Sequence, residues 1–87
     1  STARALASVL ADLAATHQVI VVTHLAQVAV MANKHYVVSK EPGDVPQTHL
    51  DEVAGDARTV EIARMLSGDH SEASLAHARQ MLEEARG

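Results

Sequence analysis

The sequence has no cysteine, tryptophan or phenylalanine and only one tyrosine, which excludes several common ways of stabilising a small domain. Without cysteine the chain forms neither disulfides nor thiolate metal sites, which fits a reducing, cytoplasmic setting. No apolar run approaches the roughly 20 residues that span a bilayer and no signal-peptide pattern is present, so we expect a soluble chain that contacts no membrane. Lys and Arg number 7 against 11 Asp and Glu, which argues against phosphate-backbone binding by this chain alone.

The apolar residues that are present are mostly small. The chain has 87 residues, 47% of them hydrophobic, and Ala, Val and Leu must therefore fill the core. A chain of this length removes only about 60% of its unfolded surface from water, so its core is thin. We expect one partial domain over residues 1–87, without internal repeats, low-complexity tracts or a linker between domains.

Periodicity predicts the helices and strands. Apolar residues at helical spacing predict helices over residues 2–16, 25–32, 60–66 and a last helix that ends near residue 85. The four β-branched residues of Val19–Val22 predict a strand covered on both faces, as in parallel sheets. His35–Lys40 and Gln47–Val53 predict two more strands, the second antiparallel and at a sheet edge, where Pro46 is tolerated.

Turn and cap residues predict where these elements end. Asn33 is predicted to stop the second helix in a left-handed conformation, and Gly68 to end the third helix. Pro42–Gly43 favours a type II turn between the last two strands. Asp69 and Glu72 have the spacing of a capping box for the last helix.

The predicted sheet is a poor free-standing sheet. A strand as apolar as Val19–Val22 needs neighbours on both edges and helices on both faces, yet at most three strands are predicted. The sequence therefore predicts an α/β fold that is the final part of a larger domain, with helices around a partial sheet and an antiparallel edge hairpin.

A candidate site lies where Val19–Val22 runs into Thr23 and His24. In open α/β sheets, ligands collect beyond the carboxyl ends of the parallel strands. An imidazole at that position can donate a hydrogen bond to a phosphate oxygen or hold an attacking water. The spacing alone leaves a second interpretation open, in which His24 only caps the short helix or hydrogen-bonds within a turn.

Three stretches of the sequence resemble the C-terminal end of the RecN family of bacterial DNA repair proteins: THQVIVVTHLAQVAVMANKHYVVSKE, EIARMLSGD and SEASLAHARQMLEEA. That family belongs to the structural-maintenance-of-chromosomes (SMC) branch of the ATP-binding-cassette (ABC) ATPases. The resemblance implies that the chain is part of a P-loop ATPase head. It also implies that His24 is the switch histidine, a catalytic residue that contacts the γ-phosphate of ATP. Gln27 matches the family pattern Thr-His-Leu-x-Gln-Val, with no implied chemical role.

The chain departs from the family pattern in ways that limit what it does alone. Ala26 stands where family members commonly have proline, which loosens the turn slightly. The phosphate loop G-x-x-x-x-G-K-[ST] is absent, and so is an acidic Walker B pair at the end of an apolar strand. The resemblance implies that these parts lie upstream, the Walker B region ending just before Ser1. We expect the fragment to be inactive and to bind no cofactor tightly, while the full-length parent hydrolyses ATP with Mg²⁺.

The resemblance also implies partners and a location for the parent protein. The head dimerises around ATP and couples hydrolysis to the handling of DNA ends in double-strand-break repair and recombination. The implied partners are the remainder of the head, a second head in a homodimer, and DNA through the full-length parent. The implied location is the cytoplasm, at the nucleoid. A non-catalytic α/β interaction module remains the alternative function.

The other histidines fit simpler interpretations than catalysis or metal binding. None of the 6 histidines is paired at i, i+4 on a helix and no carboxylate cluster supports them, so no metal site is predicted. His17 and His35 are predicted to be turn residues, and His70 and His77 to face solvent. A Ser-His-Asp triad is not predicted because no G-x-S-x-G elbow is present.

The later helices carry two further features. Arg58, Arg64 and Arg79 are scattered and are predicted to lie on solvated helix faces rather than along a DNA track. An apolar stripe on the last helix favours core packing over a partner-binding face. The stripe consists of Leu75, Ala78, Met81 and Leu82.

Overall fold

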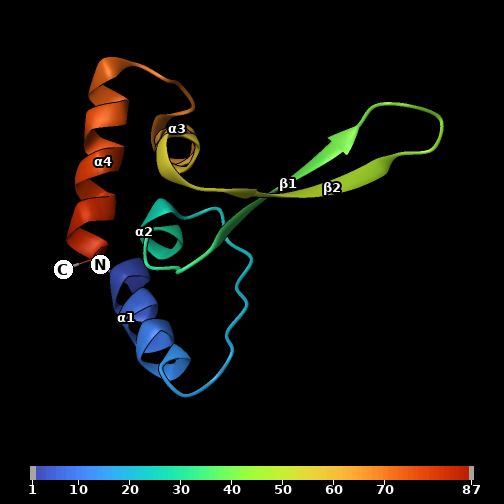
Figure 1. Cartoon of the computed structure of the whole chain (residues 1–87). Coiled ribbons are helices and arrows are strands. Elements are labelled where there is room, and N and C mark those ends of the chain that lie inside the picture. Colours follow the sequence, from blue (N-terminus) through green and yellow to red (C-terminus); the bar gives the residue numbers. More distant parts are fainter. Residues whose placement is uncertain (1, 87) are drawn as a thin grey trace.

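The computed structural model describes residues 2–86 and contains four helices and one two-stranded sheet (Figure 1). In chain order the elements are α1 (Thr2–Ala14), α2 (Ala26–Ala29), β1 (His35–Glu41), β2 (Gln47–Val53), α3 (Gly55–Ser67) and α4 (Glu72–Arg86). Helices α3 and α4 pack side by side, α2 contacts α3, and α1 contacts α2, while the hairpin of β1 and β2 projects away from the helices (Figure 1). The predicted α/β class with an antiparallel hairpin is confirmed.

The hairpin has the antiparallel pairing that the sequence predicts. His35 pairs with Val53 at its base, and Glu41 pairs with Gln47 beside the loop. Gly43 has a φ of 158°, far from the value near +80° that a type II turn requires, so the predicted turn type is wrong. Most hairpin residues face solvent, because the hairpin projects away from the helices and, within residues 2–86, no second layer covers its two faces.

The predicted strand over Val19–Val22 is not formed. Residues 18–23 are an irregular segment, in which Ile20 and Val22 are 83% and 96% exposed. A strand needs a neighbour that accepts and donates its backbone hydrogen bonds, and β-branched residues favour strands mainly by packing on such neighbours. In the described part of the chain the sheet contains only β1 and β2, so this segment has no neighbour.

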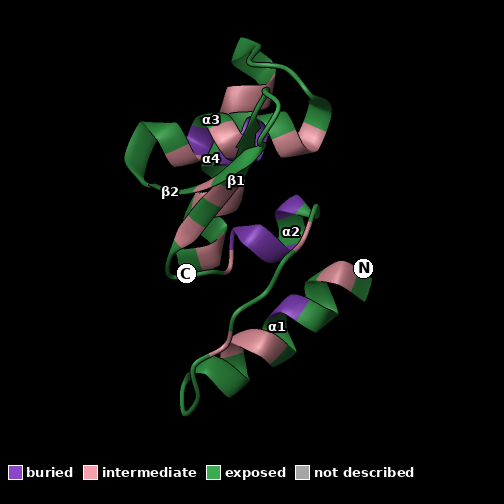
Figure 2. Cartoon of the chain, turned by 90° about the vertical axis from the view of Figure 1, so that its right-hand side faces the viewer, coloured by how far each residue is buried: buried purple, intermediate pink, exposed green. Residues whose placement is uncertain are grey.

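The core lies where α2, α3 and α4 meet, and it is built mainly from small side chains (Figure 2). Ile62 of α3 is the one large side chain that is fully buried among the described residues. Around it pack the buried residues Ala26, Ala29, Val30, Ala63 and Ala78. The stripe predicted on the last helix packs against this cluster, so its assignment to the core is confirmed.

Two helix ends were predicted from single residues, with different outcomes. Gly68 ends α3 in the left-handed conformation, with φ 74°, and its N–H donates to the carbonyl oxygen of Arg64 at 2.8 Å, as predicted. Helix α2 ends at Val30 in a right-handed conformation, and no described non-glycine residue has a positive φ, so the left-handed stop predicted at Asn33 is wrong. Among residues 2–86, no helix is both long and apolar enough to cross a membrane.

The turn between α3 and α4 is built from serines around Asp69. The Oγ of Ser71 accepts a hydrogen bond from the N–H of Ser74 at 3.2 Å, so Ser71 is the N-cap of α4. Asp69 Oδ1 instead accepts from the N–H of Ser71 at 3.1 Å, and the predicted capping box of Asp69 and Glu72 is therefore wrong. Hydrogen bonds to its carboxylate lower the pKa of Asp69 to about 2. The largest effect comes from the Ser74 hydroxyl, followed by the Ser71 N–H and the Ser71 and Ser67 hydroxyls.

Replacing Asp69 with Asn should destabilise the chain at neutral pH but not in strong acid. The pKa of Asp69 is lowered in the folded state, so its stabilising contribution is present above the unfolded value of 3.8 and is lost as the pH falls through about 2. Thermal unfolding followed by circular dichroism should give a lower Tm for Asp69→Asn at neutral pH and equal Tm values at the acid limit. A difference that persists in strong acid would contradict this assignment.

The chain exposes more surface than a compact chain of its mass. Its accessible surface is 6505 Å², about 1,600 Å² more than the roughly 4,900 Å² expected for a folded monomer of 9.2 kDa. Its radius of gyration is 14.0 Å, against about 12 Å for a compact domain of this length. Part of this surface is apolar and lies on α1 and in the segment that follows it. We call the following residues the open apolar surface: Leu6, Val9, Leu13, Ile20, Val21 and Val22.

The isolated chain should self-associate through the open apolar surface, because burying it removes apolar area from water. Size-exclusion chromatography with light scattering should show dimers or larger species whose fraction rises with concentration. Replacing Ile20 and Val22 with Thr should shift the population towards monomer, whereas Val45→Thr, at a residue that is 79% exposed in the hairpin loop, should not. A wild-type chain that stays monomeric at every concentration would contradict the prediction.

Candidate functional site

His24 lies in the turn between the irregular segment and α2. The Oγ1 of Thr23 accepts a hydrogen bond from the N–H of Leu25 at 3.0 Å, which closes this turn. Leu25 is the N-cap residue of α2, and no side chain caps that helix. The imidazole of His24 is exposed, and within residues 2–86 it makes neither the cap nor the turn hydrogen bond. The interpretation of His24 as a cap is therefore wrong.

The short helix α2 carries this turn and is held mainly by its buried face. Ala26, Val28 and Ala29 are buried, as is the C-cap residue Val30 (Figure 2). The helix has four residues, well below the roughly 12 at which isolated helices become even marginally stable. Its position, and with it the position of His24, therefore depends on tertiary contacts.

Arg58 of α3 supplies directional contacts to the end of α2. Its Nη2 donates to the carbonyl oxygens of Ala29, Val30 and Ala32 at 3.0, 3.4 and 2.8 Å. Arg58 is half-buried, so the prediction that it lies on a solvated face is wrong. Burial, and next the charge of Arg86, lower the pKa of Arg58, yet a guanidinium remains protonated in proteins. A full cation thus meets the negative end of the α2 dipole.

His35 connects the base of the hairpin to α3. It is the first residue of β1 and is half-buried, so its prediction as a turn residue is wrong. Burial, and then the charge of Arg58, lower the pKa of His35, while Glu61 acts in the opposite direction. Glu61 is engaged by Arg64, whose Nε donates to Glu61 Oε2 at 2.9 Å. The neutral imidazole of His35 is therefore favoured beside Arg58.

The remaining predicted polar positions are on the surface. His70 and His77 are exposed, as predicted, and so are Arg64 and Arg79. His17 is also exposed and follows α1, with its Nδ1 2.9 Å from Thr16 Oγ1, which agrees with a turn residue. Within residues 2–86, no group of three or more His, Asp or Glu side chains is placed to hold a metal ion.

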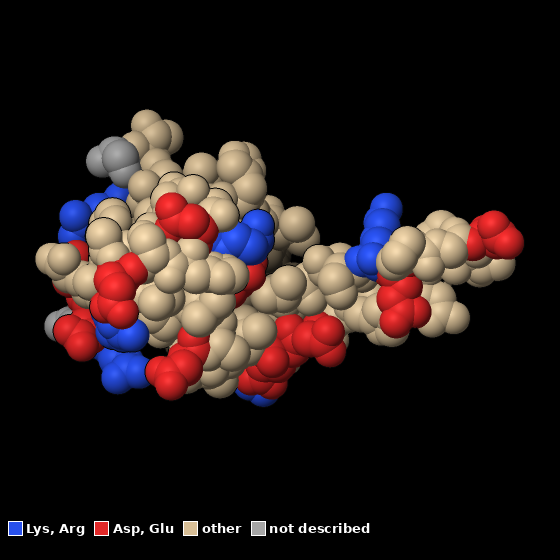
Figure 3. Space-filling view, turned by 90° about the horizontal axis from the view of Figure 1, so that it is seen from above, with Lys and Arg blue, Asp and Glu red and all other residues tan. Residues whose placement is uncertain are grey.

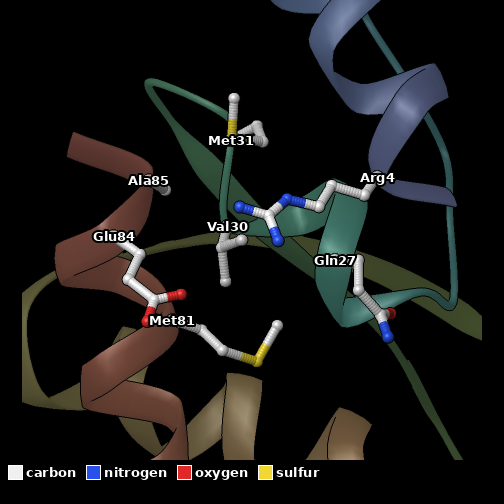
Figure 4. A pocket seen from close by; sticks show the side chains of 7 residues that line it. All are labelled: Arg4, Gln27, Val30, Met31, Met81, Glu84 and Ala85. Atoms are coloured by element: carbon white, nitrogen blue, oxygen red, sulfur yellow. The ribbon is translucent and has the colours of Figure 1, made fainter. Parts of the chain in front are cut away.

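A small pocket of about 130 Å³ lies between α1, α2 and α4 (Figure 4). Arg4 extends from α1 across it towards Val30, and Gln27 lines it from α2 (Figure 4). The other lining residues are Met31, Met81, Glu84 and Ala85. The pocket is smaller than the roughly 300–1,000 Å³ that ligand pockets usually have.

A larger open hollow of about 700 Å³ lies against α3 and α4. Both signs of charge line it, from the cations Lys34, Arg58, Arg79 and Arg86 and the carboxylates Glu52, Asp56 and Glu83. Basic and acidic side chains are also interspersed on the face seen in Figure 3, without a continuous basic track. This face therefore has no electrostatic footprint of a DNA-binding surface.

The phosphate loop of P-loop proteins has no counterpart among the residues around His24. Phosphates are held by the backbone amides and lysine of a Gly-rich loop, and the sequence contains no such loop. His24 lines neither the pocket nor the hollow. What the geometry provides is one exposed imidazole on a turn whose helix is anchored in the core.

The fold and the site define a partial α/β domain that presents a histidine between an apolar segment and a short helix. DNA repair protein RecN of Deinococcus radiodurans is 52% identical over 83 residues, covering 94% of this chain and 15% of that protein. RecN of Treponema pallidum is 47% identical over 83 residues, with 93% and 14% covered. RecN of Mycobacterium leprae is 51% identical over 78 residues, with 88% and 13% covered. No protein-family profile matches the chain.

These similarities confirm the resemblance found in the sequence. The chain is homologous to a short C-terminal segment of the DNA repair protein RecN. It spans only 13–15% of the length of these relatives, so most of each relative has no counterpart in this chain.

Proposed function

We propose that the chain is the C-terminal part of the ATP-binding and hydrolysing head of a RecN-like protein that acts in DNA double-strand-break repair and recombination. Its contribution is the switch histidine, His24. The observation that carries the proposal is an exposed His24 in the pattern Thr-His-Leu-x-Gln-Val, within a chain that is 52% identical to a RecN protein. The P-loop fold of the complete head is part of this proposal.

The open apolar surface supports the proposal that this chain is part of a larger head domain. Val19–Val22 becomes a strand when strands of the remainder of the head flank it, because β-branched runs are typical of strands buried on both faces. The excess surface of about 1,600 Å² on this one chain is about twice the roughly 800 Å² that one partner contributes to a standard protein interface. The remainder of the head is therefore the first partner of this segment.

His24 would act by hydrogen bonding to the reacting groups. Its ring N–H can donate to a terminal phosphate oxygen of ATP, or a ring nitrogen can hold the attacking water. The phosphate loop and the residues that bind Mg²⁺ belong to the remainder of the head in this proposal. A second head in a homodimer, and DNA bound by the full-length protein, complete the proposed assembly, which would work in the cytoplasm at the nucleoid.

The test is steady-state ATP hydrolysis by the full-length protein that carries this segment, with His24 replaced by Ala. A loss of at least tenfold in turnover, with ATP still bound, supports the proposed role, whereas unchanged turnover excludes it. The 87-residue chain alone should hydrolyse no ATP.

A non-catalytic α/β interaction module is the second candidate, and the open apolar surface is the observation that favours it. The reading frame of the parent distinguishes the two. A phosphate loop with Lys-Ser or Lys-Thr far upstream, and an acidic pair just before Ser1, would support the ATPase head. A coding sequence that starts near Ser1 would support the interaction module.

A further inference from the structure

The turn that bears His24 has little directional support of its own: the hydrogen bond from the N–H of Leu25 to Thr23 Oγ1 closes it. The residues before it are an irregular segment, and α2 after it has four residues and no side-chain cap at its N-terminus. The apolar contacts of Ala26 and Ala29 keep α2 in the core, but contacts of this kind are non-directional. Another contact must therefore set how α2 is turned and how far it extends.

Arg58 makes contacts with the required direction. A single nitrogen, Nη2, reaches the carbonyl oxygens of Ala29, Val30 and Ala32 across 26 to 29 positions of sequence. The carbonyl oxygen of Ala29 also accepts from the N–H of Ala32 at 3.1 Å, whereas those of Val30 and Ala32 follow the helix. Hydrogen bonds from a charged donor are roughly twice as strong as neutral ones. Nη2 has two N–H groups, so one of them is shared between two of these oxygens, and together they hold the C-terminal end of α2 in one orientation.

Arg58 lies on a helix that is anchored in the core. It lies on α3 four residues before Ile62, so both residues lie on the same side of that helix, and Ile62 is fully buried. The guanidinium thus connects α3, which carries the fully buried Ile62, to α2, which has only four residues. His24 is only five residues before Ala29 in the sequence.

We infer that Arg58 is a positioning residue for His24: by fixing the C-terminal end of α2, it sets where the imidazole stands. This inference rests on the proposed function of His24. Arg58 acts through α2 and touches neither nucleotide nor reacting atoms. Its removal should therefore change the rate of the chemical step rather than the binding of ATP.

The experiment compares Arg58→Met with wild type in the full-length protein. We expect kcat for ATP hydrolysis to fall about fivefold, since a small misplacement of a reacting group costs much of its effect, while KM for ATP stays within about twofold. Arg64→Met is the matched control, because Arg64 lies on the same helix but pairs with Glu61 at the surface. It should leave both constants unchanged.

A double-mutant cycle separates positioning from general damage. If Arg58 acts through His24, adding Arg58→Met to His24→Ala should cost no further kcat, whereas independent effects would multiply. If His24→Ala alone leaves kcat unchanged, the proposed function fails. If His24→Ala slows hydrolysis but Arg58→Met does not, or if the losses multiply, the positioning inference alone is overturned.

Arg58→Lys covers the case in which the Met variant does not fold. Lysine keeps the charge but lacks the planar fork of donors, so we expect kcat to fall about twofold and again no further loss in the His24→Ala background. Wild-type kcat in Arg58→Lys, when Arg58→Met does not fold, would overturn the inference.

Discussion

Replacing His24 with Ala in the full-length protein is expected to slow steady-state ATP hydrolysis at least tenfold, which is about 1.4 kcal/mol of activation barrier. His24 is exposed in this chain and makes no cap for α2, so its truncation should remove little folding stability. The loss would therefore report the chemical step. Turnover at saturating ATP and equilibrium binding of ATP should be measured together, with turnover reduced and binding retained.

Two further variants sharpen this prediction. His77→Ala is the matched control, since His77 is an exposed histidine on α4, and its turnover should equal that of wild type. His24→Gln keeps a neutral side-chain N–H donor and should retain more turnover than His24→Ala. Equal turnover in His24→Ala and wild type would show that His24 is not a catalytic residue.

Replacing Ile62 with Ala is expected to lower the free energy of unfolding by about 3 kcal/mol, within the range of 2–5 kcal/mol for such truncations. Ile62 is 0% exposed and is the one large side chain fully buried among the described residues. Most of the buried residues around it are alanines, which have no side-chain rotamers, so only the partly buried Met and Leu side chains that pack against the cluster can move towards the cavity. Such a loss is a large share of the stability of a small domain.

The measurement for Ile62→Ala is urea unfolding of the chain followed by far-ultraviolet circular dichroism. Val60→Ala is the matched control on the same helix, because Val60 is 38% exposed and its truncation should cost less than about 1 kcal/mol. Similar losses in the two variants would contradict the position of the core between α2, α3 and α4.

Local patterns predicted the elements that depend mainly on nearby residues. Helices α1, α3 and α4 follow from the spacing of apolar residues, and the hairpin follows from two short runs around a loop. The left-handed end of α3 at Gly68 follows from the freedom of glycine at positive φ. The Asp69 capping box failed because a serine two residues later offered the better cap for α4.

The strand predicted over Val19–Val22 failed for a different reason. Four β-branched residues favour a strand, but a strand is a property of a pair of segments and its backbone groups need a neighbour. Such a neighbour is missing within residues 2–86, and the segment remains irregular and exposed.

Of the candidate site, the sequence located His24 but missed Arg58. One signal was available, since Arg58 stands four residues before Ile62 and therefore on the buried side of the third helix. Its acceptors could not be identified from the sequence, because they lie 26 to 29 positions away.

By itself, the sequence determined the helical and strand periodicities, the thin alanine-rich core and the resemblance to RecN, because these depend on residue types and short spacings. Only the tertiary structure decided that Val19–Val22 is irregular and that Arg58 holds the end of α2. Both outcomes depend on whether a polar backbone group finds a hydrogen-bond partner far away in the sequence, and local spacing carries no information about such a partner.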